Sequence, residues 1–195
     1  MQTVSLSTRP DLLSRDRSVL LVIDLQERLA PAIEGITPVL ANAKRLLQAA
    51  DRLSVPTLVT EQYPKGLGHT VADLQDAVRP ARVLEKTAFG ALADPVVKEA
   101  CREQAGAGRS DFIILGTEAH VCVLQTAMQI IAQGWRLAVV EDACGSRRGA
   151  DKSVALERLQ SAGAQRITTE MVLFEWLERA ATPEFRDLLP VIRDA

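Results

Sequence analysis

Short runs of β-branched and leucine residues alternate along the chain with longer segments whose apolar residues recur at helical spacing. The runs predicted as strands are Ser18–Ile23, Val55–Thr60, Arg82–Glu85, Asp111–Leu115, Arg136–Val140 and Gln165–Thr168. The predicted helices are 37–53, 94–104, 120–133, 151–162 and 169–179, with a terminal helix starting at 182 and a loop at 61–69. This alternation predicts an α/β fold: a three-layer Rossmann-like sandwich with a mostly parallel six-stranded sheet and helices on both faces.

The composition narrows the class of protein. The chain has 195 residues, of which 47% are hydrophobic and 25% charged, and its net charge is −2. This length predicts a single domain over residues 1–195, with residues 1–16 as an N-terminal extension. The near-neutral charge argues against nucleic-acid and anionic-membrane partners. No apolar run approaches the ~20 residues of a membrane span, and the polar N-terminus lacks the apolar core of a secretory signal. We therefore expect a cytoplasmic protein with a small-molecule partner.

The cysteines fit a reduced protein. Cys101, Cys122 and Cys144 are an odd number, widely spaced, and form no Cys-x-x-Cys pair. This pattern is typical neither of a disulfide framework nor of a zinc site.

Reactive residues follow three of the predicted strands, where ligands bind in folds of this class. Asp24 directly follows the first strand, and it either caps a turn or faces the ligand crevice. Lys86 follows the third strand and is either a solvated surface lysine or a site residue. Cys122 lies near the start of the helix after the fourth strand, where helix amides and the helix dipole can lower a thiol pKa. Its alternative is a buried apolar cysteine.

Together an acid, a lysine and a cysteine form a set capable of nucleophilic catalysis. The acid would take the thiol proton, the lysine would favour the charged forms, and the sulfur would attack a carbonyl carbon. Cys101, inside a helical pattern, and Cys144, in a turn, lack such neighbours and are interpreted as structural. A dinucleotide-binding site is not predicted, because no Gly-x-Gly-x-x-Gly follows the first strand.

Three segments resemble the isochorismatase-like cysteine hydrolase superfamily. They are Leu20-Leu-Val-Ile-Asp-Leu-Gln26, Glu85-Lys-Thr-Ala-Phe89 and Leu115-Gly-Thr-Glu-Ala-His-Val-Cys-Val123, and they occur in the family's order. The resemblance covers roughly residues 18 to 180. It implies a catalytic triad of Asp24, Lys86 and Cys122, with Cys122 as the nucleophile. It also implies a cis peptide at Thr117–Glu118 and an oxyanion hole formed by the backbone amides of Glu118 and Cys122.

Departures from the family pattern refine the expectation. Nicotinamidases of this superfamily carry an Asp-x-His metal motif after the second strand, whereas this chain has only the isolated His69 there. We therefore expect no metal and no other cofactor, and the 61–68 stretch resembles the metal-free isochorismatase-domain hydrolases. True isochorismatases lack the cysteine, which argues against vinyl-ether hydrolysis. Gly90 stands where the family often has a serine.

The expected activity is hydrolysis of a small amide or related C–N bond through a thioester intermediate. Three alternatives stay open: vinyl-ether hydrolysis of the isochorismatase type, a redox protein in which Cys101 or Cys144 resolves an oxidised Cys122, and a non-catalytic binding or assembly module. The residues predicted to line the substrate pocket are Gln62, Tyr63, Phe89, Thr117 and His120, with Leu67 and Val121 as further candidates. Since members of the superfamily usually assemble, a homo-oligomer, dimer or higher, is expected.

Overall fold

Six parallel strands form one sheet in the computed structural model, which describes residues 12–193. The strand order is β3-β2-β1-β4-β5-β6. The strands are β1 (Ser18–Ile23), β2 (Thr57–Gln62), β3 (Arg82–Lys86), β4 (Asp111–Thr117), β5 (Arg136–Gly145) and β6 (Gln165–Ile167). The predicted six-stranded α/β fold is thus confirmed, and every strand pairing in the described chain is parallel.

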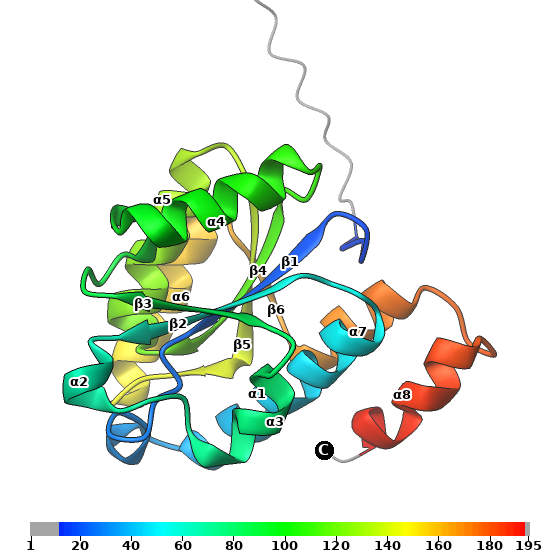
Figure 1. The fold of residues 1–195 in the computed structure, drawn as a ribbon, viewed down its shortest axis with the longest axis horizontal. Helices are drawn as coiled ribbons and strands as arrows, with labels where there is room; N and C mark the ends of the chain where they lie inside the picture. Colours follow the sequence, from blue (N-terminus) through cyan, green and yellow to red (C-terminus); the bar gives the residue numbers. More distant parts are fainter. Residues whose placement is uncertain (1–11, 194–195) are drawn as a thin grey trace, which may run out of the picture.

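Helices cover both faces of the sheet (Figure 1). One face carries α1 (Ile36–Arg52), α3 (Gln75–Val78), α7 (Thr169–Leu177) and α8 (Pro183–Arg193). The other carries α4 (Pro95–Gly106), α5 (Leu124–Ala132) and α6 (Gly149–Ser161). Shorter helical turns are η1 (Ala30–Ala32), α2 (Pro64–Leu67), η2 (Ala72–Leu74), η3 (Ala91–Ala93) and the π-helical η4 (Ala119–Val123).

The central strands are buried on both faces, as continuous apolar runs predict. All residues of β1 and β4 are buried. The indole N–H of Trp176 on α7 donates to Ser18 Oγ at 2.9 Å, which fixes α7 against the start of β1. The core therefore lies along β1 and β4, and the polar residues at their carboxyl ends sit on a rigid base.

Element boundaries differ from the prediction at several places. The helix predicted over 120–133 begins as the π-helical η4 and continues as α5 from Leu124, and the fourth strand extends to Thr117. The expected loop at 61–69 contains the end of β2 and the whole of α2. The fifth strand continues to Gly145, past the predicted end at Val140, because tertiary contacts satisfy its two charged residues. Glu141 pairs with Arg166, and Asp142 accepts hydrogen bonds from the backbone and hydroxyl of Thr169.

The N-terminal extension was predicted over residues 1–16, and residues 1–11 of it lie outside the described part of the chain. From there the chain packs against α7: Leu13 is buried, and its backbone N–H donates to Glu175 Oε2 at 2.7 Å. None of the helices in the described part of the chain combines the length and apolar character that crossing a bilayer requires.

Candidate active site

The topology creates a crevice at the carboxyl ends of β1 and β4. The chain moves outward from β1 to β2 and β3, then crosses back to place β4 on the other side of β1. Ligands bind at such a switch in strand order. Asp24 follows β1 there, and η4, which contains Cys122, follows β4. Lys86 ends β3 and reaches across β2, so all three predicted reactive side chains meet at this edge.

Asp24 and Lys86 form a buried ion pair. Lys86 Nζ lies 2.7 Å from Asp24 Oδ2, and both side chains are inaccessible to solvent. The other carboxylate oxygen, Oδ1, accepts a hydrogen bond from the hydroxyl of Thr60 at 2.7 Å. Oδ2 has no hydrogen-bond donor besides this ammonium among the described residues. One oxygen is therefore held by a neutral hydroxyl, whereas the other keeps a lone pair for an incoming proton.

The Cys122 thiol interacts with both members of this pair. Cys122 is 5% exposed, so its thiol is almost completely shielded from solvent. Burial, reinforced by the Asp24 charge, raises the pKa of Cys122 to about 12. This corrects the expectation that a helix start would lower the pKa, because desolvation outweighs the dipole. The resting sulfur is a thiol that needs a base beside it.

Burial also raises the pKa of Asp24, although Lys86, Thr60 and Cys122 each act in the opposite direction. A carboxyl whose pKa lies above its ordinary value is a stronger base than an exposed aspartate. Asp24 is therefore suited to accept the thiol proton and later return it.

The turn between β4 and η4 is built on a close backbone approach. Gly116 has φ +123°, and a Cβ on it would lie 2.0 Å from the carbonyl oxygen of Ile23. The next peptide, Thr117–Glu118, is cis, as the resemblance implied. Thr117 is fully buried, and its hydroxyl donates to the carbonyl oxygen of Asp24 at 2.7 Å. This bond ties the turn to the end of β1, so Thr117 contacts the Asp24 backbone.

The residues after the cis peptide have partners on the β5–α6 connection. Arg147 Nε donates to Glu118 Oε1 at 2.5 Å. The ring of His120 is partly exposed, and its Nδ1 lies 3.0 Å from the hydroxyl of the buried Ser146. These contacts hold the Glu118 and His120 side chains against the 146–147 segment, on one side of the site.

Two aromatic side chains predicted for the substrate pocket lie at the rim. Tyr63 is 55% exposed and Phe89 is 56% exposed. Tyr63 adopts φ 39° and rests on the backbone of Gly66, where a Cβ would lie 2.4 Å from the ring. A cavity of about 260 Å³ opens beside Tyr63, lined also by Pro64, Lys65, Glu85, Lys86, Thr87 and Asp94.

Gln62 is buried beside Lys86 rather than at the rim. Its Oε1 accepts a hydrogen bond from Lys86 Nζ at 2.6 Å, and its Nε2 donates to the carbonyl oxygen of Thr87. Sequence reasoning did not single out Thr60 or Gln26, which also support the site. Their positions could have indicated this role: Thr60 ends the predicted second strand, and Gln26 belongs to the Asp-Leu-Gln segment.

Gly90, where the family often has a serine, faces α5. A Cβ at Gly90 would lie 2.7 to 2.8 Å from the amide group of Gln129. The same amide accepts a hydrogen bond from the backbone N–H of Leu92 at 2.9 Å. Gln129 therefore occupies the space that a side chain at position 90 would need.

Cys101 and Cys144 are free, fully buried thiols. Burial raises the pKa of each to about 12, so the pKa alone does not separate them from Cys122. The kind of contact does: Cys122 has side-chain hydrogen bonds with Asp24 and Lys86. Cys144 interacts with Lys152 and Asp142 only through their charges, and Cys101 lies on the buried face of α4.

His69 pairs with Glu61 at the place where the nicotinamidase motif would lie. Its Nδ1 is 2.8 Å from Glu61 Oε2, and Glu61 Oε1 accepts from the backbone and hydroxyl of Thr70. Within residues 12–193, no group of three or more His, Cys, Asp or Glu side chains is arranged to hold a metal ion.

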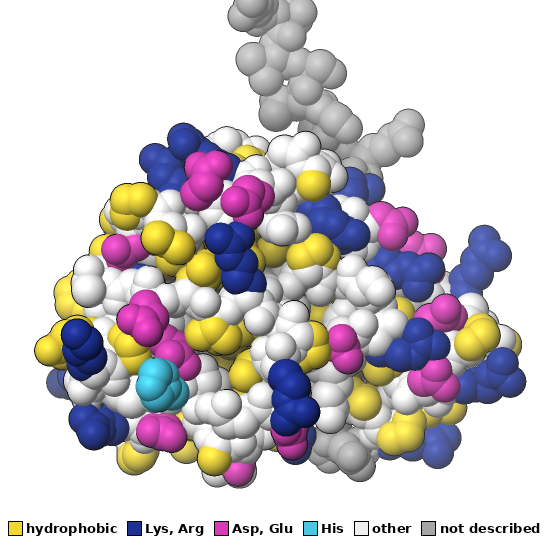
Figure 2. All heavy atoms as spheres, viewed as in Figure 1, with side chains coloured by type: hydrophobic (Ala, Val, Ile, Leu, Met, Phe, Trp, Pro, Cys, Tyr) yellow, Lys and Arg dark blue, Asp and Glu magenta, His cyan; other side chains and the backbone are white. Residues whose placement is uncertain are grey.

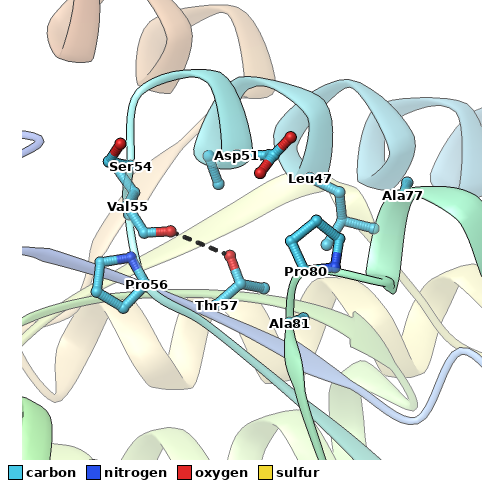
Figure 3. A pocket seen from close by; sticks show the side chains of 10 residues that line it. Leu47, Asp51, Ser54, Val55, Pro56, Thr57, Ala77, Pro80 and Ala81 are labelled. Atoms are coloured by element: carbon cyan, nitrogen blue, oxygen red, sulfur yellow. Dashed lines mark hydrogen bonds between the residues drawn. The ribbon is translucent and has the colours of Figure 1, made fainter.

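A second cavity, of about 270 Å³, lies at the opposite end of β2 (Figure 3). Leu47 and Asp51 of α1, Pro56 and Thr57 at the start of β2, and Pro80 line it. None of the predicted reactive residues lines this cavity, so it is separate from the candidate site at the carboxyl edge.

Comparison with known proteins identifies the family. The Isochorismatase domain matches residues 18–171. The chain belongs to the isochorismatase family. Isochorismatase domain-containing protein 1 of Danio rerio is 37% identical over 181 residues, which cover 93% of this chain and 62% of the zebrafish protein. The chain thus spans less than two thirds of that relative's length.

Solved structures share the isochorismatase fold. The structure of the MAR1 ribonuclease from Caenorhabditis elegans has a TM-score of 0.86 at 34% identity, covering 93% of this chain and 92% of that one. The YcaC gene product of Escherichia coli, described as an octameric hydrolase of unknown specificity, has a TM-score of 0.84 at 25% identity, covering 95% of each chain. Family membership and fold therefore indicate a hydrolase, whereas the substrate differs or is undefined among its members.

Proposed function

We propose that this isochorismatase-family protein hydrolyses a small amide, or a related C–N bond, through a thioester on Cys122. The observation that supports this proposal is the contact of the Cys122 thiol with the buried Asp24–Lys86 pair. A thiol beside a carboxylate of raised pKa has a base for its proton, and the fixed ammonium favours the thiolate that forms. Nothing in this arrangement requires a cofactor.

Asp24 transfers two protons in the proposed reaction, one from Cys122 to the leaving nitrogen and one from water to the sulfur. Asp24 takes the proton of Cys122 as the sulfur bonds to the substrate carbonyl carbon. The tetrahedral intermediate collapses when the C–N bond breaks, and Asp24 gives that proton to the leaving nitrogen. Asp24 then takes a proton from water, whose oxygen attacks the thioester. Breaking the C–S bond releases the acid, and the sulfur recovers the proton from Asp24.

The backbone amides of Glu118 and Cys122 are the proposed donors to the oxyanion of each intermediate. In support, the N–H of Glu118 has no hydrogen-bond acceptor within the described residues 12–193. A preorganised donor of this kind contributes about 3–4 kcal/mol to lowering the barrier. The rim residues Tyr63, Phe89 and His120 are the proposed contacts for the substrate.

A panel of small aliphatic and aromatic amides tests the function, with turnover followed as ammonia or amine release. Wild type should turn over at least one amide and form an acyl adduct on Cys122 that intact-mass spectrometry detects. Cys122→Ala should lose both. Cys101→Ala is the matched control, because it removes a buried thiol that has no acidic partner. Undiminished turnover in Cys122→Ala would refute the thioester route.

The same panel should include an RNA oligonucleotide and hydrogen peroxide. The C. elegans relative is named a ribonuclease, and a peroxidatic thiol is the redox alternative. RNA cleavage that survives Cys122→Ala, or peroxide consumption without amide turnover, would replace the proposed reaction.

We also propose that the protein assembles with copies of itself. The octameric description of the E. coli relative supports this proposal. Light scattering coupled to size-exclusion chromatography at micromolar concentration tests it, and a mass equal to one 21.2 kDa chain would contradict it.

A further inference from the structure

The ammonium group of Lys86 is surrounded by three oxygen acceptors. Nζ lies 2.7 Å from Asp24 Oδ2, 2.6 Å from Gln62 Oε1 and 3.2 Å from the carbonyl oxygen of Ala88. An ammonium has three N–H groups and no acceptor site. The three oxygens therefore match the three N–H groups of a charged lysine, and the Cys122 thiol also interacts with this ammonium.

The Gln62 amide can take only one orientation in this network. Its Nε2 donates to the carbonyl oxygen of Thr87 at 2.6 Å, while its Oε1 faces Lys86. Rotating the amide by half a turn would place its NH₂ against the lysine N–H groups and its oxygen against a carbonyl oxygen. Gln62 thus presents a fixed acceptor to Lys86. Gln62 itself is buried, with an exposed fraction of 8%.

Gln26 in turn fixes the backbone of Gln62. Gln26 Oε1 accepts from the backbone N–H of Gln62 at 2.7 Å, and Gln26 Nε2 donates to the Gln62 carbonyl oxygen at 3.0 Å. The same Nε2 donates to the carbonyl oxygen of Gly68 at 2.6 Å. The side-chain amide of Gln26 continues the hydrogen bonding of β1 with β2 beyond the point where β1 ends.

We infer that Gln62 is a positioning residue for the proposed reaction: it clamps the Lys86 ammonium against Asp24, and Gln26 holds Gln62 in place. This inference rests on the proposed function of the triad. The longest of the three contacts of Nζ is that to Ala88, so this N–H is the one that can turn toward the thiolate of Cys122 when it forms. The Asp-Leu-Gln segment therefore supplies both the base, Asp24, and the residue that fixes the lysine's support.

Alkylation of Cys122 by iodoacetamide measures the clamp without a substrate. The probe reacts with the thiolate, so its rate at pH 8 reports how well the Asp24–Lys86 pair supports that form. Gln62→Met removes the acceptor at similar side-chain length and should slow the alkylation about tenfold, as expected for a lost hydrogen bond to a charged group. Gln62→Glu loses the donor to the Thr87 carbonyl oxygen but keeps a charged acceptor for Lys86, so it should bring the rate to within about threefold of wild type.

Gln75→Met is the matched control, because Gln75 donates a single hydrogen bond to the carbonyl oxygen of Thr70 and makes no contact with Lys86. It should lower the melting temperature, as Gln62→Met should, but leave the alkylation rate unchanged. If Gln62→Met shows no cooperative melting, Gln26→Met replaces it, since it removes the backbone support of Gln62, together with the bond to Gly68, but leaves the Gln62 amide itself in place. Slower alkylation in that variant supports the clamp.

Failure of the inference and failure of the proposed function give different results. Alkylation of Gln62→Met, or of a folded Gln26→Met, at the wild-type rate would overturn the clamp, even if Cys122→Ala abolishes amide turnover. Slowed alkylation with rescue by Gln62→Glu would uphold the clamp, even if no amide in the panel is hydrolysed.

Discussion

Lys86 Nζ and Asp24 Oδ2 lie 2.7 Å apart in a part of the protein that solvent does not reach. Removing one member of a buried ion pair leaves an uncompensated charge and costs about 3–5 kcal/mol. Lys86→Met should therefore lower the free energy of unfolding by about that amount and abolish amide turnover.

The double variant Asp24→Leu/Lys86→Met is the control for this prediction. It removes both charges and should be more stable than Lys86→Met alone, although equally inactive. Urea denaturation of wild type, Asp24→Leu, Lys86→Met and the double variant completes the double-mutant cycle. A loss of stability in the double variant equal to the sum of the two single losses would show that the pair is not coupled.

The raised pKa of Asp24 predicts the pH dependence of the reaction. Asp24 must be ionised to accept the thiol proton, so the alkylation rate and kcat/KM should fall as the pH drops through its pKa. Since burial raises that pKa from its ordinary value of 3.8, the acid limb should lie above pH 3.8. Lys86→Gln should move the limb to still higher pH, because the lysine lowers this pKa. An acid limb at or below pH 3.8 would contradict the assignment of Asp24 as the base.

Much of the fold, and the placement of the candidate site residues at one edge of the sheet, could be predicted from local sequence. The apolar runs that become β1 and β4 fix the centre of the sheet, and the alternation with helices makes it parallel. Asp24 directly follows β1, and Cys122 lies in η4, the turn after β4, so their convergence follows from the topology. The cis peptide at Thr117–Glu118 could be expected only from the family resemblance, because no local pattern distinguishes it.

The hydrogen bonds that hold Lys86 and Gln62 in place could not be predicted, because they join residues far apart in the chain. Gln26 and Gln62 are 36 residues apart, and nothing in their local sequence pairs their amides. The raised pKa of Cys122 could not be predicted for a similar reason. A helix start is visible in the sequence, whereas the burial that outweighs it depends on the packing of β1, β4 and α5.

Gly116 is predicted to be indispensable for the turn that carries the cis peptide. A Cβ at this position would lie 2.0 Å from the Ile23 carbonyl oxygen, in addition to the cost of φ +123°. Gly116→Ala should lower the free energy of unfolding by more than about 3 kcal/mol. Gly134→Ala is the control: it has φ +78° but nothing within 4 Å, so it should cost only about 1–2 kcal/mol. Equal losses in urea denaturation would show that the close approach is unimportant.

Arg45 is predicted to hold α8 to the rest of the molecule. Its guanidinium is buried and donates to the carbonyl oxygens of Val191 and Ile192 at 2.8 and 3.0 Å. Arg45→Met leaves these carbonyls without a donor and should cost about 1–3 kcal/mol. It should also speed proteolysis within 183–193. Arg52→Met removes the exposed pair with Asp187 and should cost at most about 1 kcal/mol. Protease resistance unchanged by Arg45→Met would refute this role.

The Glu61–His69 pair predicts a pH-dependent contribution to stability. Nδ1 of His69 lies 2.8 Å from Oε2 of Glu61. On the face of the molecule drawn in Figure 2, a histidine side chain lies close to acidic ones. The hydrogen bond to Glu61, together with the charges of Glu61, Glu27 and Glu85, raises the pKa of His69 above 6.5. For Glu61, burial opposes ionisation, but hydrogen bonds from His69 and Thr70 outweigh it and lower the pKa below 4.5.

The direction of each pKa shift determines the pH range in which the Glu61–His69 pair stabilises the folded protein. A raised histidine pKa stabilises the folded protein below pH 6.5 and loses this effect as the pH rises through the folded value. A lowered glutamate pKa stabilises it above pH 4.5 and loses this effect as the pH falls. His69→Asn should therefore lower the melting temperature by about 1–2 °C between pH 4.5 and 6.5, and by less as the pH rises further. Gln75→Met, which removes an uncharged bond to the same loop, should show a pH-independent difference. A His69→Asn difference that grows toward alkaline pH would contradict the pairing.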